Sequence, residues 1–248
     1  MRPGDIERLK KLLPTSLGSE EVRARFAADI LRRSVFSARM AHAAYLAKVR
    51  EVCAAVADGT MDQATARARL LSVLEQMGHS QLDPGGLMNP ASQRRLDLII
   101  DTQRQMAASV AMLSEETEAT VAMHPAWRLA RMGAPRMPRT DWPARWRAAG
   151  DACGWEGACK DDFVALKGSP IWQELGNGAG GFRDTLMNPY PPFAFSSTMA
   201  WEPVGRDECA ALGLDPDGAS GTRATLSPSE REIAEAAKRY GFDVGRYS

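Results

Sequence analysis

Arginine and tryptophan side chains alternate in one stretch of the chain, between His124 and Arg147. Six arginines stand there against a single acid, Asp141. Guanidinium groups can bind phosphates and aromatic rings can stack on bases, so nucleic-acid-binding surfaces use this composition. The alternative is a surface that faces solvent or a partner, with the tryptophans in the core. The stretch contains Arg128, Arg131, Arg136, Arg139, Arg145 and Arg147, together with Trp127, Trp142 and Trp146.

The pair of cysteines and the pair of aspartates in the second half do not form the patterns of a metal site or of a catalytic site. Cys153 and Cys159 are separated by five residues, whereas ligand pairs of structural zinc sites are separated by about two to four and are joined by a second pair. Asp161 and Asp162 are adjacent, and adjacent residues point in different directions on any regular element. This favours a solvated turn or a helix start over an acid-base pair. We therefore predict no catalytic residues, no metal site and no cofactor.

A glycine-rich segment and two histidines complete the candidates. The segment from Asn177 to Gly181 lacks the lysine and the strand-to-helix setting of a phosphate-binding loop, so we interpret it as a flexible connection. His42 is expected within a helix and His79 directly after a helix-ending glycine. We interpret both histidines as structural.

Long helices are the elements expected to organise the first half. Apolar residues recur at spacings that approximate one helical face over residues 19–57, which predicts a single long helix that ends before Gly59. A second helix is predicted over residues 62–77, and the two would form a helical hairpin. A third helix is predicted to begin near Asn89 and Pro90 and to run on to position 123.

Proline and tryptophan dominate the second half. All six tryptophans follow position 123, and their burial is expected to hold this region together. Short helices are predicted over residues 141–149, 170–175 and 206–212, a strand over 163–166, and a final capped helix over 227–241. The predicted fold class is α+β, with a helical region at 1–123, a Trp/Pro/Gly-rich α+β region at 124–205 and a C-terminal helical tail at 206–248.

The charge balance excludes a global electrostatic attraction to nucleic acid or to membranes. Lysine plus arginine and aspartate plus glutamate both number 31. No apolar run approaches the roughly 20 residues that span a bilayer, and the start lacks a signal-peptide pattern. We expect a product of the cytosol with no membrane contact. Its four cysteines, Cys53, Cys153, Cys159 and Cys209, are expected to be reduced.

Several short segments between residues 20 and 205 carry a family resemblance through their order and spacing. They are Asp58, Gly59 and Thr60; Met77 and Gly78; the run from Arg95 to Gln103; Pro125 to Arg128; Pro138 to Trp142; Pro170 to Trp172; and Pro191 with Pro192. In this order they resemble the phage Mu F-like minor head proteins, also called phage head morphogenesis proteins.

The resemblance implies a structural minor component of a tailed-phage or prophage head, associated with the portal vertex and acting in head morphogenesis or genome delivery. The implied partners are the portal protein and the major capsid or scaffold protein, with packaged double-stranded DNA nearby. The protein would be made in the host cytoplasm and reside in the virion head. Partner contact would rest on exposed aromatics and the arginine-rich segment, and the family signature places Trp127, Trp172, Pro191, Pro192, Phe193 and Phe195 in this role.

The end of the signature departs from the family. Family members commonly continue from the double proline to a histidine or asparagine and a Cys-Arg-Cys triplet, whereas residues 193–197 here read Phe, Ala, Phe, Ser, Ser. A metal or thiol role linked to that triplet does not transfer to this chain. Two other functions remain open: a genome-delivered effector enzyme of the ADP-ribosyltransferase type, and a DNA-binding module that uses the arginine-rich segment.

Overall fold

The computed structural model describes residues 2–133 and 139–218, which divide into two compact units. The first unit ends at Ser114 and the second begins at Glu115, so residues 115–123 and 206–218 belong with the tryptophan-rich region rather than with separate segments. Helices and short strands both occur, and this confirms the α+β class. Arg136 and the helix predicted over 227–241 lie outside the described residues.

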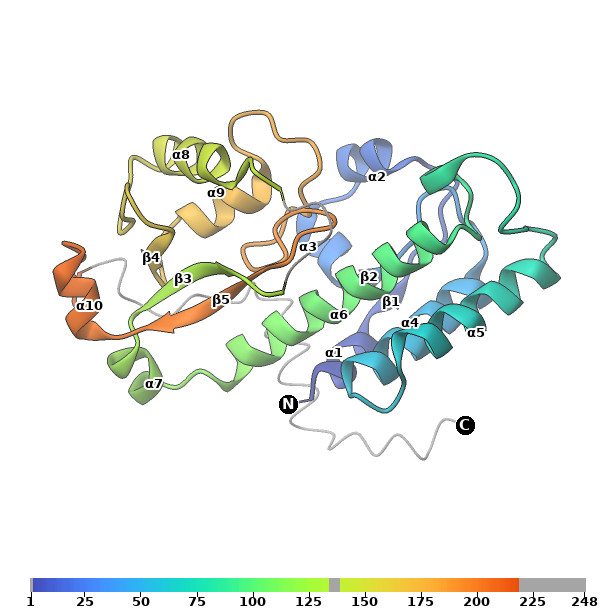
Figure 1. The fold of residues 1–248 in the computed structure, drawn as a ribbon, viewed down its shortest axis with the longest axis horizontal. Helices are drawn as coiled ribbons and strands as arrows, with labels where there is room; N and C mark the ends of the chain where they lie inside the picture. Colours follow the sequence, from blue (N-terminus) through green and yellow to red (C-terminus); the bar gives the residue numbers. More distant parts are fainter. Residues whose placement is uncertain (1, 134–138, 219–248) are drawn as a thin grey trace. The chain divides into compact units, whose positions relative to one another are not determined.

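Three long helices build the first unit: α4 (Ala43–Ala57), α5 (Gln63–Gln76) and α6 (Gln93–Glu115) (Figure 1). Helix α5 begins where it was predicted, after an N-cap at Asp62, whose Oδ1 accepts the N–H of Thr65 at 2.9 Å. The turn after α4 places Gly59 at a φ of 72°, which glycine adopts without a side-chain clash. These observations confirm the predicted hairpin and third helix. The core that they enclose includes Tyr45, Leu46, Val49, Val52, Leu70, Leu74, Leu96 and Ile100.

The prediction of one unbroken helix over residues 19–57 is wrong. The chain forms α2 (Ser19–Arg25), α3 (Ala28–Arg32) and β2 (Ser34–Val35) before α4 begins. Strand β2 pairs in parallel with β1 (Lys11–Leu12), and this pairing uses backbone groups that a continuous helix would need. The apolar spacing misled the prediction because Val35 still enters the same core as the helical residues.

Helix ends in the N-terminal half of the chain also differ from the predictions. His42 is the N-cap of α4, where its Nδ1 accepts the N–H of Tyr45 at 3.4 Å, instead of lying within a helix. Helix α6 begins at Gln93 rather than at Pro90. Its predicted continuation is interrupted after Glu115, and a separate helix α7 (Glu118–Met123) follows a cap at Thr117. A short unpredicted helix, α1 (Pro3–Leu9), packs against α4.

An antiparallel sheet with the strand order β4-β3-β5 organises the second unit (Figure 1). The strands are β3 (Ala126–Arg131), β4 (Val164–Leu166) and β5 (Met199–Val204). Strand β4 confirms the strand predicted over 163–166, whereas β3 and β5 were not predicted as strands. The register pairs Leu129 with Trp201 and Trp127 with Pro203, so both tryptophans point to the same face.

Three short helices accompany this sheet close to their predicted ranges: α8 (Trp142–Ala152), α9 (Ile171–Asn177) and α10 (Arg206–Ala211). Helix α9 ends at Gly178 in the left-handed conformation, with a φ of 81°. A β-carbon there would lie 2.2 Å from the Phe182 carbonyl oxygen, so only glycine fits this close approach. Within the described residues, no helix combines the length and the apolar character needed to cross a bilayer.

Candidate functional site

Tryptophans from separate elements of the second unit meet in one aromatic core. Trp127 and Trp201 lie on neighbouring strands and stack with ring centroids 5.3 Å apart and planes 2° apart. Trp172 from α9 packs its edge against Trp201 at 5.2 Å, and Phe193 stacks on Trp172 at 6.0 Å. Trp146 from α8 closes the cluster on Trp172 at 5.7 Å. Offset and edge-on packing of this kind stabilises a core beyond the area that it buries.

This core contains most of the residues that the family signature selects. Trp127, Trp172, Pro191, Pro192 and Phe193 are all buried. Phe195 is half-buried, so it offers the one partly exposed side chain of the signature set. The expectation that these aromatics are exposed to a partner is therefore corrected: five of the six side chains can shape a surface only from beneath.

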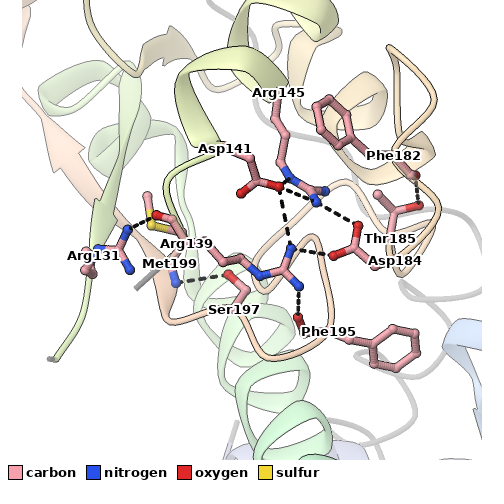
Figure 2. Close-up of polar contacts among 10 residues, drawn as sticks. All are labelled: Arg131, Arg139, Asp141, Arg145, Phe182, Asp184, Thr185, Phe195, Ser197 and Met199. Atoms are coloured by element: carbon pink, nitrogen blue, oxygen red, sulfur yellow. Dashed lines mark hydrogen bonds and ion pairs between the residues drawn. The ribbon is translucent and has the colours of Figure 1, made fainter. Parts of the chain in front are cut away.

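Two arginines and two aspartates of the second unit lie together, and we call them the ionic cluster: Arg139, Asp141, Arg145 and Asp184 (Figure 2). Asp184 accepts hydrogen bonds from Arg145 Nη2 at 2.7 Å and from Arg139 Nη1 through its other oxygen. Arg145 Nε also binds Asp141 at 2.8 Å. Arg139 Nη2 donates to the Phe195 carbonyl oxygen at 2.7 Å. The cluster thus ties the start of α8 to the irregular segment 182–197.

Electrostatics keep Asp184 in its charged form. Burial raises the pKa of the Asp184 carboxyl group, but hydrogen bonds and charge from Arg145 and Arg139 outweigh it, and the resulting pKa lies below the ordinary value. A carboxylate held in this way accepts hydrogen bonds and serves poorly as a general acid near neutral pH. The arrangement is chemically suited to holding two segments together.

Arg145 is the central member of the ionic cluster. Its guanidinium carbon lies 4.2 Å from the ring centroid of Phe182 and 5.5 Å from that of Trp142. The side chain is buried, and it satisfies its charge through two carboxylates and two ring faces. Arg145 is therefore committed to the fold and not presented to a nucleic acid.

The other predicted phosphate-binding arginines divide into two groups. Arg128 on β3 binds Asp162 at 3.1 Å and Glu208 at 2.6 Å, so this arginine is also balanced by acids. Arg131 and Arg147 are exposed, and Arg131 Nη2 donates to the Arg139 carbonyl oxygen at 2.8 Å. The structure thus brings Arg131, Arg139 and Arg145 together. Acids from distant parts of the chain pair with Arg139 and Arg145, and other acids pair with Arg128.

A buried lysine was missed by sequence reasoning. The Lys167 ammonium, 1% exposed, pairs with Glu116 and lies 4.0 Å from the ring centroid of Trp127. The residue follows strand β4 in a run of apolar residues, and nothing in that run distinguishes a buried lysine from an exposed one. Only the packing of Glu116 and Trp127 on either side creates this site.

The remaining candidates stay apart from one another. Among the described residues the four cysteines are free, and no three His, Cys, Asp or Glu side chains gather as a metal site would require. Burial raises the pKa of the thiol of Cys153, which disfavours its thiolate. The glycine segment after α9 is hydrogen-bonded, with Phe182 N–H donating to the Gly178 carbonyl oxygen at 3.2 Å.

No protein-family model, curated protein sequence or solved structure matches this chain. The function must therefore be argued from the aromatic core and the ionic cluster. The aromatic core joins β3, β5, α8 and α9, and the ionic cluster ties the start of α8 to segment 182–197. Segments that are held in one conformation before binding lose less entropy when a partner binds.

Proposed function

We propose that this protein is a structural minor head protein of a tailed bacteriophage or prophage, associated with the portal and acting in head morphogenesis or genome delivery. One observation carries the proposal beyond the sequence resemblance. Trp127, Trp172 and Phe193, which belong to signature segments far apart in the chain, pack into one core. A docking body requires that side chains from separate segments hold one fixed shape.

The ionic cluster supports an assembly role over a reaction centre. Its two arginines pair with its two aspartates, and the pKa of Asp184 is shifted away from neutrality. A catalytic acid or base works best with a pKa near the working pH. The cluster therefore acts, in this proposal, as a clamp that keeps segment 182–197 in one conformation for the portal protein or for the capsid or scaffold proteins.

Co-assembly with the portal protein tests this function. The full chain would be co-expressed with the portal and major capsid proteins encoded in the same genome, and portal rings or heads would be isolated by sedimentation. We expect the chain to sediment with them. The variant Arg145→Gln should weaken the association because segment 182–197 loses its clamp, while the exposed Arg147→Gln should not. A chain that stays at the top of the gradient while portal rings and heads form would refute the proposal.

Binding to duplex DNA distinguishes the rival nucleic-acid function. In the proposed assembly role, the paired arginines leave little charge for phosphates, so we expect weak binding. A DNA-binding module would instead show an affinity that falls steeply with salt, and the slope would decrease for Arg131→Gln combined with Arg147→Gln. Fluorescence anisotropy of a labelled duplex over a salt series measures this difference.

A further inference from the structure

A glutamate, a lysine and a glutamine meet in the interior of the first unit, and we call Glu7, Lys10 and Gln103 the buried triad. Glu7 lies on α1, which packs against α4 (Figure 1), and Lys10 directly follows α1. Gln103 lies on α6, 93 positions after Lys10. Glu7 is 0% exposed, Lys10 3% and Gln103 9%. Polar side chains are rarely buried so completely, so three of them in contact mark a site that apolar packing does not require.

The lysine nitrogen bridges the other two side chains of the buried triad. Lys10 Nζ donates to Glu7 Oε1 at 2.5 Å and to Gln103 Oε1 at 2.6 Å. Because a carbonyl bond is about 1.23 Å long, the second contact places Nζ within about 3.8 Å of Gln103 Cδ. Reacting atoms in near-attack conformers are about 3–3.5 Å apart, so only a small shift of the side chains brings the amine to the amide carbon.

The backbone around Lys10 is held on both sides. Its N–H donates to the Glu7 carbonyl oxygen at 3.2 Å, and its carbonyl oxygen accepts Arg50 Nη1 from α4 at 3.0 Å. At the other end of α1, Asp58 accepts the Gly4 N–H at 2.9 Å. An amine and an acyl group that are held together in this way react within one molecule, which accelerates a reaction by orders of magnitude over a bimolecular encounter.

The Glu7 carboxyl group has an oxygen that can take up a proton. No donor among the described residues binds its Oε2, which is buried. Burial raises the pKa of Glu7 more than the charge and the hydrogen bond of Lys10 lower it. A carboxyl group with a raised pKa is better suited near neutral pH to accept a proton as a base and to return it as an acid.

We propose that the buried triad forms an isopeptide bond between Lys10 and Gln103, with Glu7 as the catalytic residue. Glu7 takes a proton from the Lys10 ammonium, and the neutral amine attacks Gln103 Cδ. The carboxyl group then delivers this proton to Nε2 as the bond between Cδ and Nε2 breaks. The departing ammonia takes up the second proton that the amine loses and leaves as ammonium. One amide thus replaces another, and the exchange needs no oxidant or reductant.

The bond would join α1 to α6 across 93 positions of the chain. It can form only after folding has brought the two helices together, so the freshly folded chain retains the pair of Lys10 and Glu7 and the bond accumulates with time. A cross-link of this span restricts the unfolded chain and opposes the local opening of α1. The inference goes beyond the function proposed above and does not depend on it.

The intact mass of the purified full chain tests the bond. After several days at neutral pH we expect a species lighter than the sequence mass by one ammonia, about 17 Da. Trypsin does not cleave after an acylated lysine, so the peptide Leu9–Lys11 should be joined to Leu96–Arg104. Condensation of Lys10 with Glu7 would instead release water, about 18 Da, leave Leu96–Arg104 free and overturn the proposal.

Three variants separate the roles within the buried triad. Lys10→Met removes the amine and Gln103→Leu removes the amide, so neither should give the joined peptide. Glu7→Gln retains the shape but not the acid, and the joined peptide should form about a hundredfold more slowly or less. The matched control is Lys11→Met, which changes the exposed neighbouring lysine and should give the joined peptide at the wild-type rate. Circular dichroism verifies that each variant is folded.

Two results would overturn the isopeptide bond. One is a folded wild-type chain that keeps its full sequence mass over the whole incubation. The other is an unchanged loss of ammonia from folded Gln103→Leu, because a different amide would then be its source. Wild-type chain kept in guanidinium chloride should retain its full mass, since the unfolded chain does not hold the buried triad together.

Discussion

One carboxylate site in each unit holds its charge in the opposite way. In the first unit, Lys10 Nζ contacts Glu7 Oε1 at 2.5 Å and Gln103 Oε1 at 2.6 Å, and both charged side chains are almost fully buried. In the second unit, the ionic cluster leaves Asp184 partly exposed between two arginines. Burial raises the pKa of Glu7, whereas two arginines hold the pKa of Asp184 below its ordinary value. Burial thus makes the charged form of Glu7 less favourable, whereas the two arginines make the charged form of Asp184 more favourable.

The units also differ in what forms their cores. Helical faces at regular spacing enclose aliphatic side chains in the first unit. The second unit has short elements, and stacked tryptophans from two strands and two helices hold them together. All six tryptophans belong to this second unit. Tryptophan fluorescence therefore reports the second unit alone, and far-UV circular dichroism reports the helices of both.

The largest effect is expected from Trp172→Ala, which removes the ring that joins Trp146, Trp201 and Phe193. We expect the free energy of unfolding of the second unit to fall by about 4 kcal/mol, because a buried tryptophan leaves a large cavity. Denaturant titration followed by tryptophan fluorescence measures it. The half-buried Trp155→Ala is the control, and an equal loss in both variants would contradict a core centred on Trp172.

Lys10→Met is expected to follow, with a loss of about 3 kcal/mol in the first unit, because Glu7 would remain buried without its partner. The circular dichroism transition should shift to lower denaturant, and tryptophan fluorescence should not change. Lys10→Met combined with Glu7→Leu should recover most of the loss, since an apolar pair removes the unpaired charge. A double variant as unstable as the single one would show that the pair has a specific packing role.

The contributions of Glu7 and Asp184 to stability should depend on pH with opposite signs. The pKa of Asp184 is lower in the folded state than in the unfolded chain, so its contribution is complete above about pH 4 and is lost as the pH falls through the folded pKa. Glu7 has a raised folded pKa, so its contribution is complete below about pH 4 and is lost as the pH rises through the folded value.

The Asp184 contribution is expected to be about 1 kcal/mol, because the partly exposed pair is screened by solvent. Fluorescence-detected unfolding between about pH 2 and 6 should show this loss in acid for the wild type and not for Asp184→Asn. An identical acid profile for the wild type and the variant would assign the acid sensitivity of the second unit to another carboxylate.

The smallest effect is expected from Leu82→Ser in the connection between α5 and α6. Its side chain is 94% exposed, so the free energy of unfolding should change by no more than about 0.5 kcal/mol in either direction. Thermal unfolding followed by circular dichroism measures it. A clear loss of stability would mean that Leu82 packs against the rest of the protein.

The sequence by itself determined those helices and strands whose ends are marked by capping or turn-forming residues. Asp62 caps α5, Gly59 ends the turn before it, and the strand and short helices of the second unit lie near their predicted ranges. Prediction failed where a strand and a helix could place the same apolar residue in the core. In residues 19–57, Val35 fits the spacing of a helical face, but it reaches the core from strand β2.

Only the tertiary structure decided which charges meet and which aromatics are buried. The arginines between positions 124 and 147 read as a basic patch along the chain, but Asp162, Asp184 and Glu208 arrive from distant segments and balance three of them. Lys167 likewise becomes a buried cation only because Glu116 and Trp127 pack beside it. Electrostatic interaction depends on distance in space, and sequence spacing specifies that distance only within one helix or strand.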